Sequence, residues 1–152
     1  MSGTDRIEQK VVLPVPRLRA WEAIGNSTEF GTWFRCRFEG PFEARRWLGA
    51  VLTEPEWDGI PFVVHVERVE PGRHLSFRWH ADDVDLEGDY TDEPTTLVSF
   101  DLEDVPEGTL LVIAEAGFEG LPGDVGPAAR ERNAKGWAIQ ADRVREHVVG
   151  TS

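Results

Sequence analysis

The chain has 152 residues, a length that fits one domain with a core of ordinary size. Its 28 acidic side chains outnumber the 16 basic ones and give a net charge of −12, which argues against nucleic-acid phosphate or an anionic membrane surface as a partner. No basic segment followed by an apolar run opens the chain, and no stretch is apolar enough for a membrane span. We therefore expect one cytoplasmic domain over residues 1–152, without membrane insertion.

The first third of the chain predicts one strand and two short helices. Residues 7–13 read as a strand that ends at Pro14, and Pro16 suits the first turn of a helix. Apolar residues then recur at helical spacing until Gly25. The segment Asn26-Ser27-Thr28 offers N-cap candidates for a second short helix. This second helix carries three rings, those of Phe30, Trp33 and Phe34.

The middle of the chain predicts strands joined by tight turns. Residues 47–54 and 60–69 are separated by Asp58-Gly59, a pair typical of hairpins. The Glu-Pro-Gly segment at residues 70–72 fits a type II turn and leads into a strand over 75–79. In that strand the period of two predicts Leu75, Phe77 and Trp79 inside, and Ser76, Arg78 and His80 in water.

The last third predicts a hairpin and a long helix. Residues 96–102 and 110–116 form the two strands, joined by a proline-initiated turn at 105–108. A helix then runs from Pro127 to about Val149. Its apolar stripe consists of Ala134, Trp137, Ala138, Ala141, Val144 and Val148. The expected fold class is α+β, in the order βααββββββα, with a curved antiparallel sheet wrapped around the long C-terminal helix and two short helices.

The composition of the helix stripe predicts a cavity. The stripe is mostly alanine with one tryptophan, so space is left between helix and sheet unless rings from the sheet fill it. Six tryptophans and eight phenylalanines against one tyrosine also suit an apolar interior or cavity better than a wet recognition surface. Pockets enclosed in this way are apolar with a few polar groups.

Glu115 is the polar group whose orientation the pattern leaves open. Both faces of residues 110–116 are apolar, so periodicity does not choose between them. If Leu111 and Ile113 face the helix, Glu115 faces it too and becomes a buried carboxylate that an Arg or a hydroxyl must compensate. The alternative places Glu115 at the strand end, paired with a surface Arg.

Four blocks carry a family resemblance across nearly the whole chain. The first is 16–24 (PRLRAWEAI) with 30–34 (FGTWF), and the second is 75–79 (LSFRW). The third is 96–102 (TLVSFDL) with 107–109 (EGT) and 115–118 (EAGF), and the fourth is 133–137 (NAKGW). In this order the sequence resembles the START-like (SRPBCC, helix-grip) superfamily, and within it the bacterial homologues of the activator of the heat-shock-ninety chaperone ATPase. The resemblance implies a helix-grip fold with a cavity that takes lipids, polyketides, hormones or flavonoids. Some members of the superfamily catalyse cyclisation or ring hydroxylation. The resemblance implies no catalytic set that transfers to these positions.

We therefore predict that the chain binds an apolar small molecule of the lipid, polyketide or aromatic class between the C-terminal helix and the sheet. The contact residues are Trp33, Phe62, Trp79, Phe100, Ile113 and Trp137, with Glu115 as the polar contact. The other interpretation of these rings is plain core packing.

An enzyme of the polyketide cyclase or hydrolase type is the first alternative, and it is less favoured. It would need an acid or base in the cavity, for which Glu115, His65 and Arg78 are the candidates. The sequence has no nucleophile elbow, phosphate loop or zinc motif, and its four histidines lack metal-ligand spacing, so we expect no metal and no cofactor. The single cysteine, Cys36, is expected to be a buried small hydrophobe.

A protein-interaction domain of the cochaperone kind is the second alternative. Residues 82–93 hold seven carboxylates in twelve positions, a density typical of a solvated loop that could dock weakly on the basic surface of a partner. A calcium loop would require spaced ligands and a closing Glu, which this segment lacks. Monomer and homodimer both stay open, as does a chaperone partner.

Overall fold

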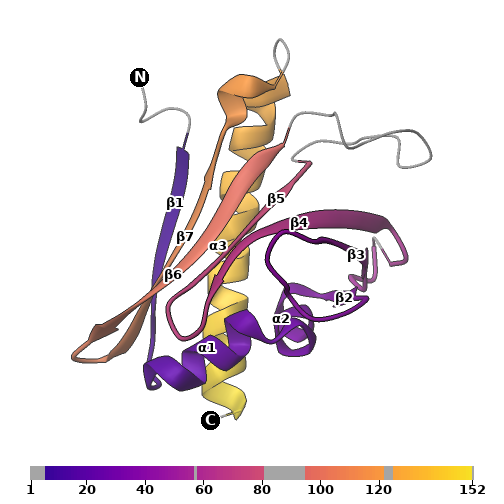
Figure 1. The fold of residues 1–152 in the computed structure, drawn as a ribbon. Coiled ribbons are helices and arrows are strands. Elements are labelled where there is room, and N and C mark those ends of the chain that lie inside the picture. Colours follow the sequence, from indigo (N-terminus) through magenta and orange to yellow (C-terminus); the bar gives the residue numbers. More distant parts are fainter. Residues whose placement is uncertain (1–5, 57, 81–94, 122–124, 152) are drawn as a thin grey trace.

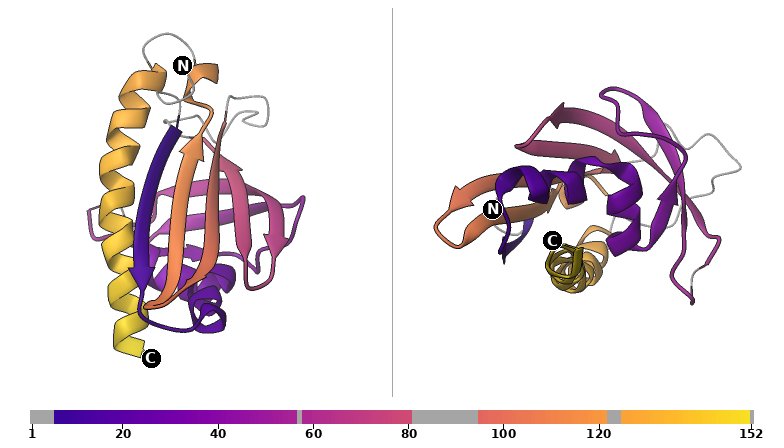
Figure 2. Two further views of the ribbon diagram at one scale, coloured as in Figure 1. Left: turned by 90° about the vertical axis from the view of Figure 1, so that its left-hand side faces the viewer. Right: turned by 90° about the horizontal axis from the view of Figure 1, so that it is seen from below.

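A computed structural model describes residues 6–56, 58–80, 95–121 and 125–151. Within these residues, one curved antiparallel sheet lies against the long helix α3 (Val125–Thr151). Two short helices, α1 (Arg17–Gly25) and α2 (Ser27–Phe34), lie near the C-terminal end of α3 (Figures 1 and 2). The acidic segment 82–93 falls outside the described residues.

The sheet has seven strands in the described part of the chain, in the order β1-β7-β6-β5-β4-β3-β2. Their bounds are β1 Arg6–Leu13, β2 Cys36–Phe38, β3 Trp47–Leu52, β4 Pro61–Glu70, β5 His74–Trp79, β6 Thr96–Val105 and β7 Gly108–Ala116. The 3-10 helix η2 (Phe118–Gly120) follows β7. Every neighbouring pair is antiparallel, and β1 returns to pair with β7 beside the hairpin β6–β7. The predicted α+β fold with a curved sheet around a C-terminal helix is confirmed.

The predicted turns and caps form for the expected reasons. Gly72 has a φ of 79°, the left-handed conformation that the Glu-Pro-Gly turn between β4 and β5 requires. Gly108 has a φ of 141° in the β6–β7 turn, where an added Cβ would lie 2.4 Å from the carbonyl oxygen of Leu13. The side chain of Asn26 accepts a hydrogen bond of 3.0 Å from the backbone N–H of Glu29 and so caps α2.

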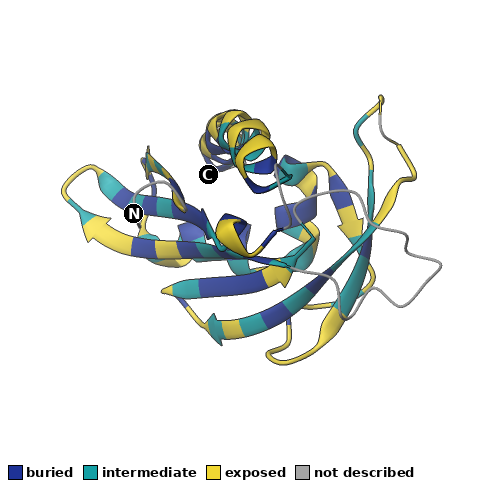
Figure 3. Ribbon diagram, turned by 90° about the horizontal axis from the view of Figure 1, so that it is seen from above, coloured by how far each residue is buried: buried dark blue, intermediate teal, exposed yellow. Residues whose placement is uncertain are grey.

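Helix α3 buries one stripe against the inner face of the sheet. Its buried residues include Ala129, Trp137, Ala141, Val144 and Val148. Figure 3 shows the buried side of α3 turned toward the sheet and the exposed residues on the far side. The helix begins at Val125, two residues before the Pro127 that we expected as its start. Of the described helices, none has the combination of length and apolarity that crossing a membrane would need.

Two orientation predictions are wrong. Ala138 is exposed, because one residue along a helix turns the side chain by about 100° and carries it off the stripe that holds Trp137. Ser76 is buried rather than in water. It lies in the middle of β5, flanked by Arg68 on β4 and Ser99 on β6, so its small side chain leaves little area for water to reach.

Candidate functional site

The core contains a continuous group of aromatic rings, centred on Phe30 of α2. The ring centroid of Phe30 lies 4.5 Å from that of Trp33 and 5.4 Å from that of Phe34 on the same helix. It also lies 5.4 Å from Phe100 of β6 and 6.4 Å from Phe77 of β5, both in edge-on arrangements. Helix α2 is thereby fixed to the inner face of the sheet by ring contacts.

Trp137 brings α3 into the same group. Its ring centroid lies 5.7 Å from that of Trp79 on β5 with an interplanar angle of 25°, which is a stacked pair. It also lies 5.8 Å from Phe100 and 6.0 Å from Phe34. Trp137 is 3% exposed, so it stands at the centre of the contact between α3, α2 and the sheet.

Four rings at the margin of this group reach solvent. We call Phe34, Phe38, Phe62 and Trp79 the aromatic rim; each is partly buried and packs against the core. Neighbouring rings of the rim touch, with centroid distances of 6.1 Å for Phe38–Phe62, 6.4 Å for Phe62–Trp79 and 6.2 Å for Phe34–Trp79. The rim is therefore a series of touching, partly buried rings that runs from α2, β2 and β4 to the Trp79–Trp137 stack.

Glu115 of β7 faces the helix and is fully buried, at 0% exposure. It lies on the same face as Leu111 and Ile113, which are equally buried, and it pairs in register with Val98 of β6 and Ile7 of β1. The first of the two orientations considered for Glu115 is therefore confirmed, and the alternative pairing with a surface Arg is wrong.

Four side chains donate hydrogen bonds to the Glu115 carboxylate. The indole N–H of Trp137 donates to Oε1 at 2.8 Å, and that of Trp79 donates to Oε2 at 2.9 Å. The hydroxyl of Thr96 donates to Oε2 at 2.6 Å. The side-chain amide of Asn133 donates to both oxygens at 3.2 Å. We call Glu115 with these four donors the carboxylate cluster.

The chemistry of the cluster follows from its donors. All four are neutral groups, and they come from β5, β6 and α3, so the carboxylate joins the helix to the sheet. Both of its oxygens accept hydrogen bonds, which is the pattern of an ionised carboxylate. A buried carboxylate without such donors would be strongly destabilising, and hydrogen bonds to a charged acceptor are among the stronger ones in proteins.

The structure brings the seven residues predicted from the sequence into one region. Trp33, Phe62, Trp79, Phe100 and Trp137 belong to the ring group, and Ile113 pairs in register with Phe100. The sequence interpretation missed Thr96 and Asn133. Thr96 could have been found, because it alternates with the inward-facing Val98 and Phe100. Asn133 could have been found because it precedes Trp137 by one helical turn.

The other acid–base candidates lie away from the carboxylate cluster. His65 and Arg78 are paired in register on β4 and β5, and both contact Glu67 on the outer face, at 3.4 Å and 3.2 Å.

Burial raises the pKa of the Cys36 thiol to about 12, so this cysteine is a neutral thiol at ordinary pH, as expected of a buried hydrophobe. Within the described ranges, no group of three or more His, Cys, Asp or Glu side chains could hold a metal ion.

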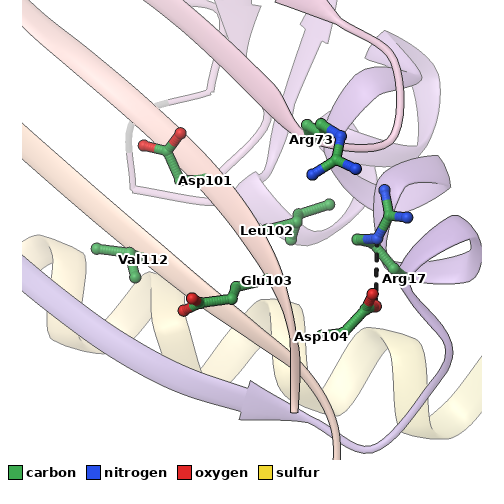
Figure 4. A pocket seen from close by; sticks show the side chains of 7 residues that line it. All are labelled: Arg17, Arg73, Asp101, Leu102, Glu103, Asp104 and Val112. Atoms are coloured by element: carbon green, nitrogen blue, oxygen red, sulfur yellow. Dashed lines mark hydrogen bonds and ion pairs between the residues drawn. The ribbon is translucent and has the colours of Figure 1, made fainter.

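A groove of about 550 Å³ lies in a different place (Figure 4). Its lining consists of Arg17, Arg73, Asp101, Leu102, Glu103, Asp104 and Val112. Arg17 of its wall donates to Asp104 Oδ1 at 3.2 Å and to the carbonyl oxygen of Gly72 at 2.9 Å. With charges of both signs along its wall, this groove is a poor match for an apolar ligand. It is also lined by none of the seven residues predicted to form the site.

Comparison with known proteins identifies relatives of this fold. The model of the family described as "Activator of Hsp90 ATPase homolog 1-like protein" matches residues 14–148. No curated protein sequence matches significantly.

Several solved structures share the fold. Protein MLL2253 from Mesorhizobium loti has a TM-score of 0.75 and 19% identity over 97% of this chain and 98% of its own. A protein from Arthrobacter aurescens has a TM-score of 0.79 and 14% identity over 99% of this chain and 89% of its own. DynU16, a protein from the dynemicin biosynthetic locus, has a TM-score of 0.70 and 21% identity over 95% of this chain and 47% of its own, so this chain spans about half of it.

Proposed function

Since this chain belongs to the Activator of Hsp90 ATPase homolog 1-like protein family, we propose that it binds an apolar small molecule of the lipid, polyketide or aromatic class between α3 and the sheet. The observation that carries the proposal is the aromatic rim, four touching rings that stay partly exposed although each packs against the core. Apolar side chains that stay partly exposed next to one another often mark a binding site.

The rim leads toward a buried polar group. Trp79 belongs to the rim, stacks on Trp137 and donates a hydrogen bond to Glu115. A ligand that covers Trp79 and Phe62 would therefore approach the carboxylate cluster with one end. Pockets for small molecules combine an apolar wall with a small number of placed polar groups in this way.

The helix contributes small side chains at the same place. Ala134 of α3 is partly buried and packs against the core one residue after Asn133. Ala134 lies three residues before Trp137 on the same face of the helix, where its small side chain would take up less of the site than a larger one. The buried Trp33, Phe100 and Ile113 would form the floor of the site, beneath the rings that meet the ligand first.

Binding of a fluorescent apolar probe tests the proposal. We expect N-phenyl-1-naphthylamine to bind with an increase in emission, and to raise the melting temperature, because a ligand that binds only the native state stabilises it. Unlabelled lipids, polyketides and aromatic compounds that share the site should displace the probe. An unchanged emission and melting temperature with the probe and with all three compound classes would contradict the proposal.

Two substitutions locate the site. Phe62→Leu and Trp79→Leu each remove a rim ring, and we expect each to weaken binding of the probe about tenfold, the equivalent of ~1.4 kcal/mol. Phe62→Leu is the safer variant, because it leaves the carboxylate cluster intact, whereas Trp79→Leu also removes a hydrogen bond to Glu115. The matched control is Trp47→Leu, since Trp47 is 41% exposed and contacts His65 on the outer face of the sheet. Equal losses in the rim variants and the control would place binding elsewhere.

A further inference from the structure

The four donors of the carboxylate cluster are not equivalent. The contacts from Thr96, Trp137 and Trp79 measure 2.6 to 2.9 Å, and each is directed to one oxygen. The amide of Asn133 is shared between both oxygens at 3.2 Å, which is the longest and least directed of the contacts. The hydrogen bonds from Asn133 to Glu115 are thus the weakest of the cluster.

Asn133 is also the most accessible donor from α3. Its residue is partly exposed, whereas Trp137 and Thr96 are 3% and 0% exposed. Its side chain can therefore turn toward water without opening the core, while Thr96 and Trp137 are held by packing on all sides. Trp79, the other partly exposed donor, is fixed by its stack on Trp137 and by Phe77. If the Asn133 amide turned away, the Glu115 carboxylate could accept a hydrogen bond from another donor at either oxygen.

The charge of the cluster limits what can replace that amide. The replacement meets a buried carboxylate whose protein contacts are all neutral donors, so an anionic head group would face a like charge in a medium of low dielectric constant. A group that can only accept hydrogen bonds would leave the carboxylate short of a partner. A hydroxyl group satisfies both conditions, because it donates a hydrogen bond and carries no charge at neutral pH. An ammonium group would also donate, but burying its charge carries a desolvation cost that a hydroxyl avoids.

We propose that the ligand of this site is an apolar molecule that ends in a hydroxyl group, and that this hydroxyl replaces the Asn133 amide on Glu115. The inference rests on the function proposed above and narrows its ligand class. Phenols and hydroxylated lipids or polyketides fall within the class, and fatty acids and other carboxylate-terminated molecules fall outside it. Without a ligand, the Asn133 amide donates the hydrogen bond that the ligand hydroxyl would donate to Glu115 in the complex.

Three naphthalenes with one apolar body test the inference on the native protein. The compounds 2-naphthol, 2-methoxynaphthalene and 2-naphthoate offer a donor, an acceptor only and an anion. We expect 2-naphthol to bind at least about tenfold more tightly than either of the others at pH 7, measured by isothermal titration calorimetry. Equal binding of 2-naphthol and 2-methoxynaphthalene, or tighter binding of 2-naphthoate, would overturn the inference and leave the proposed function standing. No binding of any of the three would overturn the inference alone, because the proposed function is tested by the probe and by all three compound classes.

Two variants separate recognition from structure. Asn133→Ala removes the competing amide, and we expect it to tighten 2-naphthol binding severalfold while leaving 2-naphthoate weak; a residue with a merely structural role would weaken binding of all three compounds. The matched control on the same helix is Ile139→Ala, because Ile139 is 54% exposed and its loss changes no charge. Glu115→Gln removes the anion, so the preference for 2-naphthol over 2-naphthoate should shrink to less than about threefold. A preference unchanged in Glu115→Gln would overturn the role of the carboxylate.

Discussion

Replacement of Glu115 by glutamine tests whether the carboxylate holds α3 to the sheet. The two side chains have nearly the same shape, but glutamine presents a donor in place of one acceptor oxygen. If its nitrogen takes the place of Oε1, the Trp137 N–H, now 2.8 Å away, faces another donor. If it takes the place of Oε2, the Trp79 N–H at 2.9 Å does so instead, and the Thr96 hydroxyl must turn around to accept.

At least one indole N–H therefore loses its acceptor in either orientation. A donor left without a partner in the interior costs about 1–3 kcal/mol, so we expect Glu115→Gln to lower the free energy of unfolding by about 2 kcal/mol. For a chain of this length that corresponds to a melting temperature lower by about 4–8 °C. Glu115→Leu leaves two buried donors, Thr96 and Trp137, without an acceptor. By the same reasoning it should lower the free energy of unfolding by about 4 kcal/mol.

Urea unfolding at pH 7, followed by far-ultraviolet circular dichroism, measures both variants. The matched control is Glu103→Gln, because Glu103 is exposed on β6 and should change the free energy of unfolding by no more than about 0.5 kcal/mol. The opposing effect is relief of the cost of burying a charge, which can make the loss of a buried ion stabilising. A stability of Glu115→Gln within 0.5 kcal/mol of the unmodified protein, or a gain in Glu115→Leu, would refute the reasoning.

Three further substitutions test one hydrogen bond, one helix cap and the pKa of one buried thiol. Trp137→Phe keeps a ring but removes the N–H that donates to Oε1, and urea unfolding should show a loss of about 2 kcal/mol; a loss below 0.5 kcal/mol would show that this bond contributes little. Asn26→Ala removes the cap of α2 and should cost about 1 kcal/mol in the same assay. Burial raises the pKa of Cys36 from 9.0 to about 12, so the unfolded chain loses this proton first and stability should fall as pH rises from 9 toward 12. Cys36→Val should lose less stability over that range, and parallel curves for the two proteins would contradict the assigned pKa.

The arrangement of helices and strands follows from local signals in the sequence. Asn26, Asp58-Gly59 and the turn at residues 70–72 mark element boundaries through capping and backbone conformation, which depend on few neighbours. The strand β2 was not among the ranges that we expected. It has three residues, and it follows Arg35, which ends α2 in the left-handed conformation with a φ of 70°. A non-glycine residue in that conformation is not signalled by its residue type.

The candidate site depends on register and therefore could be predicted only in part. The two faces of β7 are equally apolar, so the inward direction of Glu115 is decided by its pairing with Val98 and Ile7. The donors that make its burial tolerable come from positions 18 to 36 residues away. The hydroxyl of Thr96 is one of the two kinds of partner that we expected for a buried Glu115, but the two indole groups and the amide that complete its compensation have no local pattern in the sequence. The predicted rings could be assigned to the interior because large aromatic side chains are mostly buried.

The indole N–H resonances of the protein give the most direct test of ligand binding at the helix–sheet interface. In a ¹H–¹⁵N correlation spectrum, the signals of Trp79 and Trp137 report on the site and that of Trp47 reports on the outer face of the sheet. Titration with N-phenyl-1-naphthylamine should move the Trp79 and Trp137 signals together and saturably, and leave that of Trp47 in place. Movement confined to Trp47, or no saturable movement of any indole signal, would contradict a binding site between α3 and the sheet.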